Sequence, residues 1–276
     1  MQKRKSNSLY IPGLLIFFMI FYLNLDIPDN SKTTRNTTKL WGGKQCAVAL
    51  TYDDALGVHL DKVITSLDSF GFTGTFYIYG NTHSFKARLK EWKYAASKGN
   101  ELGNHTLFHP CNGKTEGNNW VKPEYDLNTY TVKRLTDEIK LANTLLEAID
   151  GKKKRTFAYP CGSKIVTDTL YMNLLQKDFI AARGTTPGMN YINKVDLFDI
   201  KTFGIEDGSA ETLIKLAKKA EKEHALLVIM FHGIGGEHGI NISLEEHNKF
   251  LKYLNKNKQD LWVAPLIEIV EYIKQR

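Results

Sequence analysis

Two stretches of the chain are apolar at successive positions and end in polar residues: CAVALTYDD, residues 46–54, and ALLVIMFHG, residues 225–233. A strand with one face in water alternates apolar and polar side chains, whereas a strand buried on both faces is apolar throughout. Strands of the second kind are typical of parallel sheets that helices cover on both sides. These stretches therefore predict an α/β fold around a parallel sheet.

From Trp41 onward the chain alternates short apolar segments with amphipathic ones. Further strands are expected over residues 73–80, 101–106, 155–162, 178–184 and 261–264. Apolar residues at helical spacing predict helices over residues 58–71, 85–99, 131–151, 209–224, 243–257 and 265–275. A barrel and a doubly wound sheet both fit this order, and both bind ligands at the carboxyl ends of their strands.

Residues 1–25 have the pattern of a targeting segment, in which the basic sequence MQKRK precedes an apolar run over residues 9–23. This run is long for a signal peptide and short for a membrane span, so an export signal and an uncleaved membrane anchor both stay open. Both place the rest of the chain outside the cytoplasm, and an anchor would associate it with a membrane. The polar residues 26–40 are expected to link this segment to a folded domain over residues 41–276.

The formal net charge is +7, yet the chain has no basic stripe and no arginine-lined helix suited to a groove. The sequence therefore argues against nucleic acid binding. The three cysteines, Cys46, Cys111 and Cys161, match no Cys-x-x-Cys pattern. We expect no disulfide framework, and Cys46 in its apolar run is expected to be an inert thiol. The sequence does not indicate an oligomeric state.

Polar residues follow the ends of several expected strands. They are Asp53 and Asp54, His105 and His109, Tyr159 to Gly162, Arg183, and His232. Because the carboxyl ends of parallel strands meet at one edge of a sheet, we expect these side chains to come together there.

The residue types at this edge suit metal-assisted hydrolysis. Two neutral imidazoles and one carboxylate form a common open metal site, which leaves positions for water and substrate. His105 and His109 share one face if the segment turns helically after its strand. The adjacent carboxylates Asp53 and Asp54 can divide metal binding and proton transfer between them. His232 is suited to the role of a general acid.

Each of these features is more often structural when it occurs alone. Histidine pairs at this spacing commonly lie on surfaces, paired acids commonly cap helices, and a lone histidine after a buried strand is usually a hydrogen-bonded core residue. The His-Glu-x-x-His protease signature is absent, because Thr106 stands where the glutamate would be. The functional interpretation therefore depends on the convergence of all these residues.

Four motifs in this order, TYDD, NHTLFH, FAYPCG and VIMFHG, resemble those of the polysaccharide deacetylases with the NodB homology domain, carbohydrate esterase family 4. The resemblance extends from Lys44 to the C-terminus. It implies a distorted (β/α) barrel of about seven parallel strands. It also implies that residues 41–276 form a catalytic domain.

The resemblance implies a metal-dependent deacetylase. Asp54, His105 and His109 match the residues that bind a divalent metal in this family, most often zinc. Asp53 matches the base that activates the water held at the metal, and His232 the acid that protonates the leaving amine or alcohol. The reaction would release acetate from an acetylated glycan, with N-acetyl groups favoured over O-acetyl groups.

The resemblance also implies how the remaining site is built. The backbone N–H of Cys161 would help to hold the oxyanion, and Tyr159 and Pro160 would form a wall of the substrate groove. Many members carry an arginine beside the base where this chain has Ala158. Arg183 is the candidate to replace that charge, and an ordinary surface arginine is the alternative.

The chain also departs from the family pattern. Cys161 stands where a tyrosine is usual, which keeps the backbone donor and makes the wall smaller. Cys111 is expected to approach Cys161 as a thiol outside the ligand set, rather than as a ligand or a disulfide partner. Asp196 and Asp199 are the candidates for the acid that tunes the catalytic histidine.

The glycine-rich loop over residues 233–239 lacks the lysine of a phosphate-binding loop. We expect it to form a flexible wall of the site, with Glu237 and His238 as substrate contacts.

Two other functional classes stay open. One is an amidohydrolase that acts on a small C–N substrate, such as a cyclic imide. Relatives of that kind lose part of the ligand set, which is complete here. The other is a non-catalytic carbohydrate-binding relative, which would lack the base or the acid, whereas Asp53 and His232 are both present.

Overall fold

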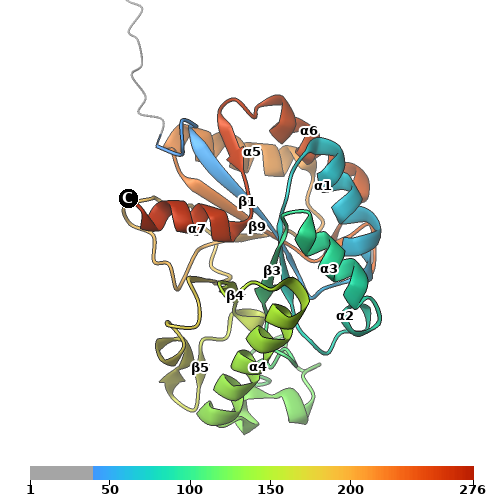
Figure 1. The fold of residues 1–276 in the computed structure, drawn as a ribbon, viewed down its shortest axis with the longest axis vertical. Coiled ribbons are helices and arrows are strands. Elements are labelled where there is room, and N and C mark those ends of the chain that lie inside the picture. The colour runs from blue at the N-terminus through green and yellow to red at the C-terminus, as the bar shows by residue number, and fades with distance from the viewer. Residues whose placement is uncertain (1–39) are drawn as a thin grey trace, which may run out of the picture. The chain divides into compact units, whose positions relative to one another are not determined.

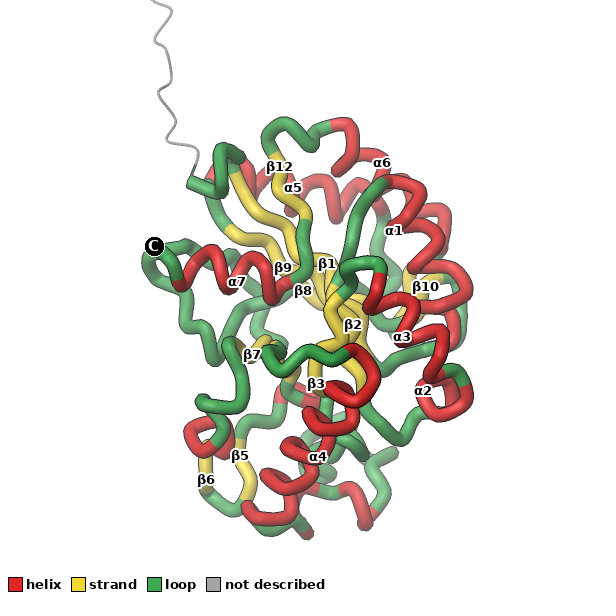
Figure 2. The backbone as a smooth tube through the Cα atoms, viewed as in Figure 1, coloured by secondary structure: helices red, strands yellow, loops and turns green. Residues whose placement is uncertain are grey.

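The computed structural model describes residues 40–276 (Figures 1 and 2). The predicted targeting segment over residues 1–25 lies outside the described residues, as does all of the predicted linker except Leu40. Within the described part of the chain, no helix has both the length and the apolar character to span a membrane.

A sheet of eight parallel strands forms the centre of the fold, which confirms the predicted α/β architecture. Seven strands follow one another in the order β7-β4-β3-β2-β1-β9-β8, and β12 pairs with β1. Their bounds are β1 (Cys46–Asp53), β2 (Thr75–Ile78), β3 (Glu101–Asn104), β4 (Thr156–Ala158), β7 (Ala181–Arg183), β8 (Phe203–Gly204), β9 (Leu226–Phe231) and β12 (Leu261–Val263).

β1 is the central strand, and all of its residues are buried, as its unbroken apolar sequence predicts. One edge of β1 pairs with β9 over Ala47–Tyr52. The other edge is divided, because Cys46–Val48 pairs with β12 and Thr51–Asp53 pairs with β2. The carboxyl end of β1 therefore lies between β2 and β9, where the sheet carries its polar residues.

A short segment, residues 200–204, connects the two open edges of the sheet. Ile200 forms a single parallel bridge with Arg183 of β7, and β8 then pairs with β9. The backbone N–H of Ile200 donates to Ala182 O at 2.9 Å, and Ile200 O accepts from Gly184 N–H at 2.9 Å. The sheet thus curls into a barrel whose closure is narrow and irregular, as expected for a distorted (β/α) barrel.

Helices surround the strands (Figure 1). Their bounds are α1 (Ile64–Phe70), α2 (His83–Ala87), α3 (Leu89–Ser97), α4 (Val132–Asp150), α5 (Ala210–Glu223), α6 (Leu244–Lys256) and α7 (Leu266–Lys274). A π-helical turn η1 (His59–Val63) precedes α1, and short 3₁₀ turns are η2 (Pro123–Tyr125), η3 (Leu127–Thr129), η4 (Pro160–Gly162) and η5 (Tyr171–Leu174). Two small ribbons pair β5 (Ile165–Val166) with β6 (Thr169–Leu170) and β10 (Gly233–Ile234) with β11 (Asn241–Ile242).

Side-chain caps explain why several helices begin where the sequence predicts. The hydroxyl oxygens of Thr131, Ser209 and Ser243 accept backbone N–H bonds at the starts of α4, α5 and α6. Gly151 ends α4 in the left-handed conformation, which only glycine adopts at little cost.

The prediction of one continuous helix over residues 85–99 is wrong. The structure divides it into α2 and α3 at Arg88, whose backbone leaves the helical region at φ −124° and ψ 33°. The Arg88 guanidinium donates to Asp61 at 2.6 Å and to Glu91 at 2.5 Å. A contact to another helix thus accompanies the break, and the helical spacing of apolar residues carries no sign of it.

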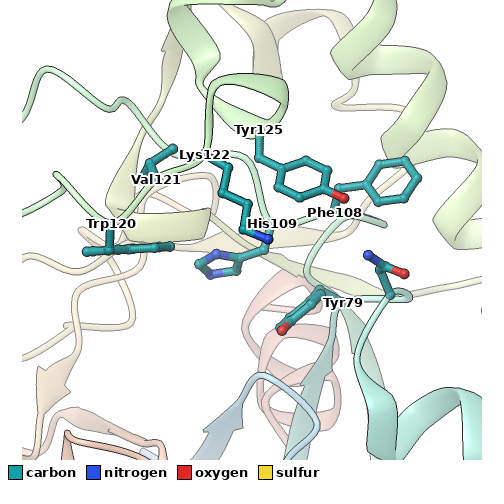
Figure 3. A pocket seen from close by; sticks show the side chains of 8 residues that line it. Tyr79, Phe108, His109, Trp120, Val121, Lys122 and Tyr125 are labelled. Atoms are coloured by element: carbon teal, nitrogen blue, oxygen red, sulfur yellow. The ribbon is translucent and has the colours of Figure 1, made fainter.

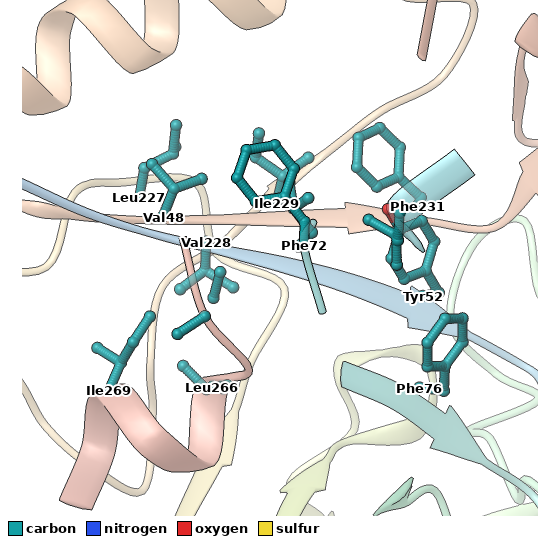
Figure 4. Packing of buried hydrophobic residues seen from close by; sticks show 14 of the residues in the cluster. Val48, Tyr52, Phe72, Phe76, Leu227, Val228, Ile229, Phe231, Leu266 and Ile269 are labelled. Atoms are coloured by element: carbon teal, nitrogen blue, oxygen red, sulfur yellow. The ribbon is translucent and has the colours of Figure 1, made fainter. Parts of the chain in front are cut away.

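Apolar side chains pack on both faces of β1 and β9 (Figure 4). Leu227 and Ile229 point to one face, while Val228 points toward Leu266 and Ile269 of α7 on the other. Near the site, the Tyr52 ring stacks between the rings of Phe76 and Phe231, with centroids 5.0 and 5.4 Å away. The Tyr52 hydroxyl lies 2.9 Å from Nε2 of the buried His247.

His247 makes the stability of the fold sensitive to acid. Burial lowers the pKa of His247 from 6.5 to about 4, so the unfolded chain binds a proton here that the folded chain excludes. Because the folded-state pKa is depressed, this contribution to stability is present above pH 6.5 and is lost as the pH falls toward 4. The free energy of unfolding should fall by about 1.4 kcal/mol per pH unit from this residue alone.

Urea unfolding of the parent chain and of His247→Gln across this range tests the prediction. The variant should show a shallower dependence on pH by that amount, whatever its stability at neutral pH. Equal slopes in the two proteins would contradict it.

Candidate active site

The carboxyl ends of the central strands open into a cavity of about 580 Å³. Most of the predicted site residues line it, namely Asp53, Asp54, His105, His109, Tyr159, Cys161 and His232. Pro160 is buried and is not among the lining residues, so the structure does not place it at the groove wall. Arg183 lies behind the cavity surface, with its side chain fully buried.

Asp53 and Arg183 form a buried ion pair. Arg183 Nη2 lies 2.5 Å from both carboxylate oxygens of Asp53. Nη1 of the same guanidinium donates to Met230 Sδ at 3.0 Å, and its carbon lies 4.8 Å from the centroid of the Tyr77 ring. Arg183 is therefore not a surface arginine. Its guanidinium, at the end of β7, supplies the positive charge that Ala158 cannot supply.

This pair determines the charge of Asp53. Burial alone would raise the pKa of the carboxyl, but the Arg183 guanidinium, with smaller effects from His105 and His232, holds it below its usual value. Asp53 is therefore ionised at neutral pH although it is almost fully buried.

Asp54 lies at the end of β1 with a left-handed backbone, φ 79°. Its N–H donates to Tyr77 O at 3.0 Å, which holds the turn against β2. Oδ1 lies 3.7 Å from His105 Nε2 and 3.5 Å from His109 Nε2. This oxygen is buried and accepts no hydrogen bond from any residue in the described range, so it is available to a cation.

The two histidines reach Asp54 without a helical turn between them. Left-handed backbones at Thr106 (φ 68°) and His109 (φ 53°) bend the loop instead, and Thr106 Oγ1 accepts the His109 N–H at 2.8 Å. Asn104 holds the start of this bend, since its Oδ1 accepts the Thr106 N–H at 2.7 Å. His105 and His109 therefore converge on Asp54 as predicted, but left-handed turns bring them there instead of the predicted helical turn.

His105 is oriented as a metal ligand would be. Its Nδ1 lies 2.8 Å from Ala158 O, so it carries the proton and donates to this carbonyl. Burial lowers the pKa of His105 to about 4, which keeps the ring neutral and leaves Nε2 unprotonated toward Asp54.

One carboxylate and two imidazoles thus offer ligand atoms within 4.8 Å of one another. This donor set, together with the unpaired oxygen of Asp54, fits a divalent metal such as zinc.

His232 and His238 approach the other oxygen of Asp54. Each Nε2 lies 3.9 Å from Oδ2, and the two rings stack with centroids 4.9 Å apart. Burial lowers the pKa of His232, against the opposing effect of the nearby carboxylates. His232 Nδ1 is buried and has no hydrogen-bond partner within residues 40–276.

Neither candidate for the acid that tunes His232 is bonded to this histidine. Asp199 pairs with Lys164 Nζ at 2.6 Å, and Asp196 accepts the Phe198 N–H at 2.8 Å. Neither carboxylate is bonded to His232, whose Nδ1 has no partner among the described residues. The resemblance to the family's motif was the only signal for these two candidates, and neither residue aligned well with it.

The loop after β9 is anchored, so the prediction of a flexible wall with Glu237 as a substrate contact is wrong. Glu237 Oε2 accepts the Val58 N–H at 2.6 Å. Lys62 Nζ donates to Gly235 O at 2.6 Å, and His59 Nε2 lies 2.8 Å from His232 O. These bonds fasten the loop to η1, and only His238 of the two predicted contacts lines the cavity.

Cys111 and Cys161 form a disulfide, which corrects the expectation of two separate thiols. The loops after β3 and β4 carry these cysteines, and the two strands are neighbours in the sheet. The Cα atoms are therefore 5.7 Å apart despite a separation of 50 residues in sequence. Cys46 is free and buried, as expected.

A second hollow, of about 200 Å³, adjoins the cavity and was not predicted from the sequence (Figure 3). Aromatic side chains of Tyr79, Phe108, Trp120 and Tyr125 line it, with the Phe108 and Tyr125 rings stacked 5.7 Å apart. Tyr79, His109 and Trp120 border both spaces. The aromatic residues of the long loop between β3 and α4 were the available signal for this hollow.

Comparison with known proteins gives a match between residues 42–178 and the family model described as polysaccharide deacetylase. This segment contains Asp53, Asp54, His105, His109 and Cys161, whereas Arg183 and His232 follow it.

Two curated relatives are similar to the chain. Gellan lyase from a Bacillus species is 25% identical over 263 residues, which cover 86% of this chain and 10% of that protein. The peptidoglycan-N-acetylmuramic acid deacetylase PdaA of Bacillus subtilis is 27% identical over 118 residues, which cover 42% of this chain and 38% of that protein. The chain thus spans only a minor part of the length of either relative.

Solved structures share the fold. A structure from Mycobacterium smegmatis assigned to the polysaccharide deacetylases aligns with a TM-score of 0.60 at 14% identity, over 84% of this chain and 91% of that one. A family 4 pseudoenzyme from Bacillus anthracis aligns with a TM-score of 0.53 at 19% identity, over 82% of this chain and 66% of that one.

Replacement of His105 tests the ligand set. His105→Ala removes one of three ligand atoms, so the variant should lose zinc on gel filtration while the parent chain retains it, as elemental analysis would show. His83→Ala, which removes an exposed histidine, is the matched control and should retain the metal. Full zinc content in His105→Ala would contradict the assignment.

Proposed function

Because the chain belongs to the polysaccharide deacetylase family, we propose that it is a metal-dependent hydrolase that removes acetyl groups from a glycan. This proposal rests on the different surroundings of the two adjacent carboxylates. Asp54 faces two imidazoles that fit a metal, while Asp53 is held ionised by Arg183 at the same cavity. Residues 41–276 are the proposed catalytic domain.

Asp54, His105 and His109 are the proposed ligands of a divalent metal, with zinc as the proposed ion. When bound, such an ion would polarise the acetyl carbonyl and lower the pKa of the attacking water. The ordered Nδ1 bond of His105 to Ala158 O keeps the ligand ring in place before metal or substrate arrives.

Asp53 is the proposed general base. Its carboxylate is ionised, borders the cavity and lies 4.0 Å from His105 Nε2, beside the ligand set. It would take a proton from the attacking water. Arg183 is the proposed positioning residue, because its bonds to both oxygens fix the plane of the carboxylate.

The backbone N–H of Cys161 is the proposed donor to the oxyanion. Gly162 and Ser163 donate their N–H groups to Tyr159 O and Pro160 O, whereas Cys161 N–H meets no acceptor among the described residues. Cys161 lines the cavity and has a left-handed backbone, φ 51°. A free, preorganised donor is what a tetrahedral intermediate requires.

His232 is the proposed general acid. The lowered pKa of its ring makes the protonated form a strong proton donor toward a leaving nitrogen. An amine leaves a tetrahedral intermediate only after it is protonated, whereas an alkoxide is a better leaving group. A positioned acid therefore favours N-acetyl over O-acetyl substrates.

The proposed substrate is a glycan whose neighbouring sugars extend from the cavity into the aromatic hollow (Figure 3). Trp120, whose side chain is 60% exposed, and Tyr79 offer flat apolar faces between the two spaces. The net charge of +7 would suit an anionic polymer such as a cell-wall glycan. The B. subtilis relative is named as a peptidoglycan-N-acetylmuramic acid deacetylase, which also favours a cell-wall glycan.

We also propose that the chain acts outside the cytoplasm, directed there by residues 1–25 as a signal or membrane anchor. The Cys111–Cys161 disulfide supports this location, because such bonds persist in oxidising compartments.

The two alternative functions find less support in the geometry. An amidohydrolase for small C–N substrates fits poorly with a cavity of about 580 Å³ that continues into a second hollow. A non-catalytic binding protein would not require an ionised base paired to a buried arginine.

Acetate release from a panel of substrates tests the proposed function. The panel contains chitotetraose, acetylated xylo-oligosaccharide and peptidoglycan fragments, each assayed before and after chelation and after addition of zinc. We expect release that chelation abolishes and zinc restores, with the preferred member indicating the glycan. No release from any member by the zinc-loaded chain would count against the proposal.

Asp53→Asn tests the role of the base. Asparagine cannot accept the proton but has nearly the same shape, so kcat should fall by roughly 10²–10⁴-fold. The zinc content should remain that of the parent chain, because Asp53 is not a proposed ligand. Turnover at the parent rate, measured by acetate release, would show that Asp53 is not the base.

A further inference from the structure

The disulfide lies directly against a proposed metal ligand. Cys111 Sγ is 3.5 Å from His109 Nδ1, while Nε2 of the same ring is 3.5 Å from Asp54 Oδ1. The imidazole of His109 therefore stands between the carboxylate on one side and the sulfur atoms on the other.

Reduction would change the chemistry of the sulfur side. A disulfide sulfur is a weak ligand, whereas two thiolates and an imidazole nitrogen form a donor set that zinc and similar ions prefer. His109, Cys111 and Cys161 offer ligand atoms within 4.8 Å of one another. Tetrahedral zinc would place two sulfur ligands about 3.8 Å apart, a separation that the loops can reach once the bond between them is broken.

We infer that reduction of the Cys111–Cys161 disulfide creates a second divalent metal site, formed by His109, Cys111 and Cys161, which takes His109 away from Asp54 and His105. A dithiol or a phosphine supplies the two electrons. The dithiol also supplies two protons and becomes a disulfide, whereas the phosphine reacts with one water and becomes its oxide. Each new thiol releases its proton when it binds the metal.

The two sites compete because they use opposite nitrogens of one ring. A neutral imidazole has a single unprotonated nitrogen. If Nδ1 binds a metal beside the sulfurs, Nε2 keeps the proton and cannot bind a metal beside Asp54. In the oxidised chain, His109 therefore remains available to bind a metal together with Asp54 and His105. The disulfide thus prevents the second site from forming, in addition to linking two loops.

The disulfide is accessible to a reductant from the side of Cys161, which is exposed, whereas Cys111 is buried. Both Cys161 and His109 line the large cavity, which gives a metal ion access to them. Cys46 does not contribute, because it is buried in the core in β1, and burial raises its pKa to about 12.

Cobalt(II) binding to the full-length chain tests the inference, because cobalt bound to thiolates gives a charge-transfer band in the near ultraviolet. The parent chain is measured without oxygen, before and after reduction by a phosphine that is then removed. We expect the band only after reduction. Cys111→Ser/Cys161→Ser, which retains Cys46, should show no band under either condition.

Two histidine variants identify the nitrogen ligand. Reduced His105→Ala should keep the band, since only the hydrolytic site has lost a ligand, whereas reduced His109→Ala should lose it. The inference fails if the reduced parent chain shows no band although a thiol reagent confirms both free thiols. It also fails if the band survives in His109→Ala. The spectrum does not depend on turnover, so its outcome is separate from that of the acetate assay.

Discussion

The buried ion pair between Arg183 and Asp53 is the interaction on which the rest of the site depends. These residues end β7 and β1, which are four strands apart in the sheet order. In a flat sheet the two strands would lie about 19 Å apart, which is more than the Arg183 and Asp53 side chains can span together, yet here their polar atoms lie 2.5 Å apart. The pair can form only because the sheet curls into a barrel, closed by the narrow segment over residues 200–204. A buried carboxylate needs a partner of opposite charge, so the closure of the barrel and the buried charge of Asp53 support each other.

The second constraint is the backbone turn at the end of β1. Adjacent residues of a strand point to opposite faces, which would separate Asp53 from Asp54. The left-handed backbone at Asp54 interrupts this alternation, so both carboxylates border one cavity. Left-handed turns at Thr106, His109 and Cys161 likewise aim the loops after β3 and β4 at the same space. These loops owe their positions to the strands beneath them and to local bonds such as those of Asn104 and Thr106.

Much of this arrangement could be predicted from the sequence. Unbroken apolar strands such as β1 and β9 identify a parallel sheet, and its topology brings their polar ends together. The ordered motifs then identify the residues that converge on Asp54. The Cys111–Cys161 bond, the anchoring of Glu237 to Val58 and the engagement of Asp199 by Lys164 could not be predicted in this way. Each depends on how two loops meet in space, and neither periodicity nor spacing along one segment carries that information.

Anomalous diffraction at the zinc edge, from crystals of the oxidised chain grown with zinc, would locate the metal relative to the two carboxylates. We propose that Arg183 holds Asp53 ionised and away from the metal, and leaves Asp54 as the carboxylate ligand. We predict one peak at roughly 2.0–2.2 Å from an oxygen of Asp54 and from Nε2 of His105 and His109, with Asp53 still bonded to Arg183. A peak coordinated by Asp53, with Arg183 displaced from it, would show that Asp53 is the ligand instead.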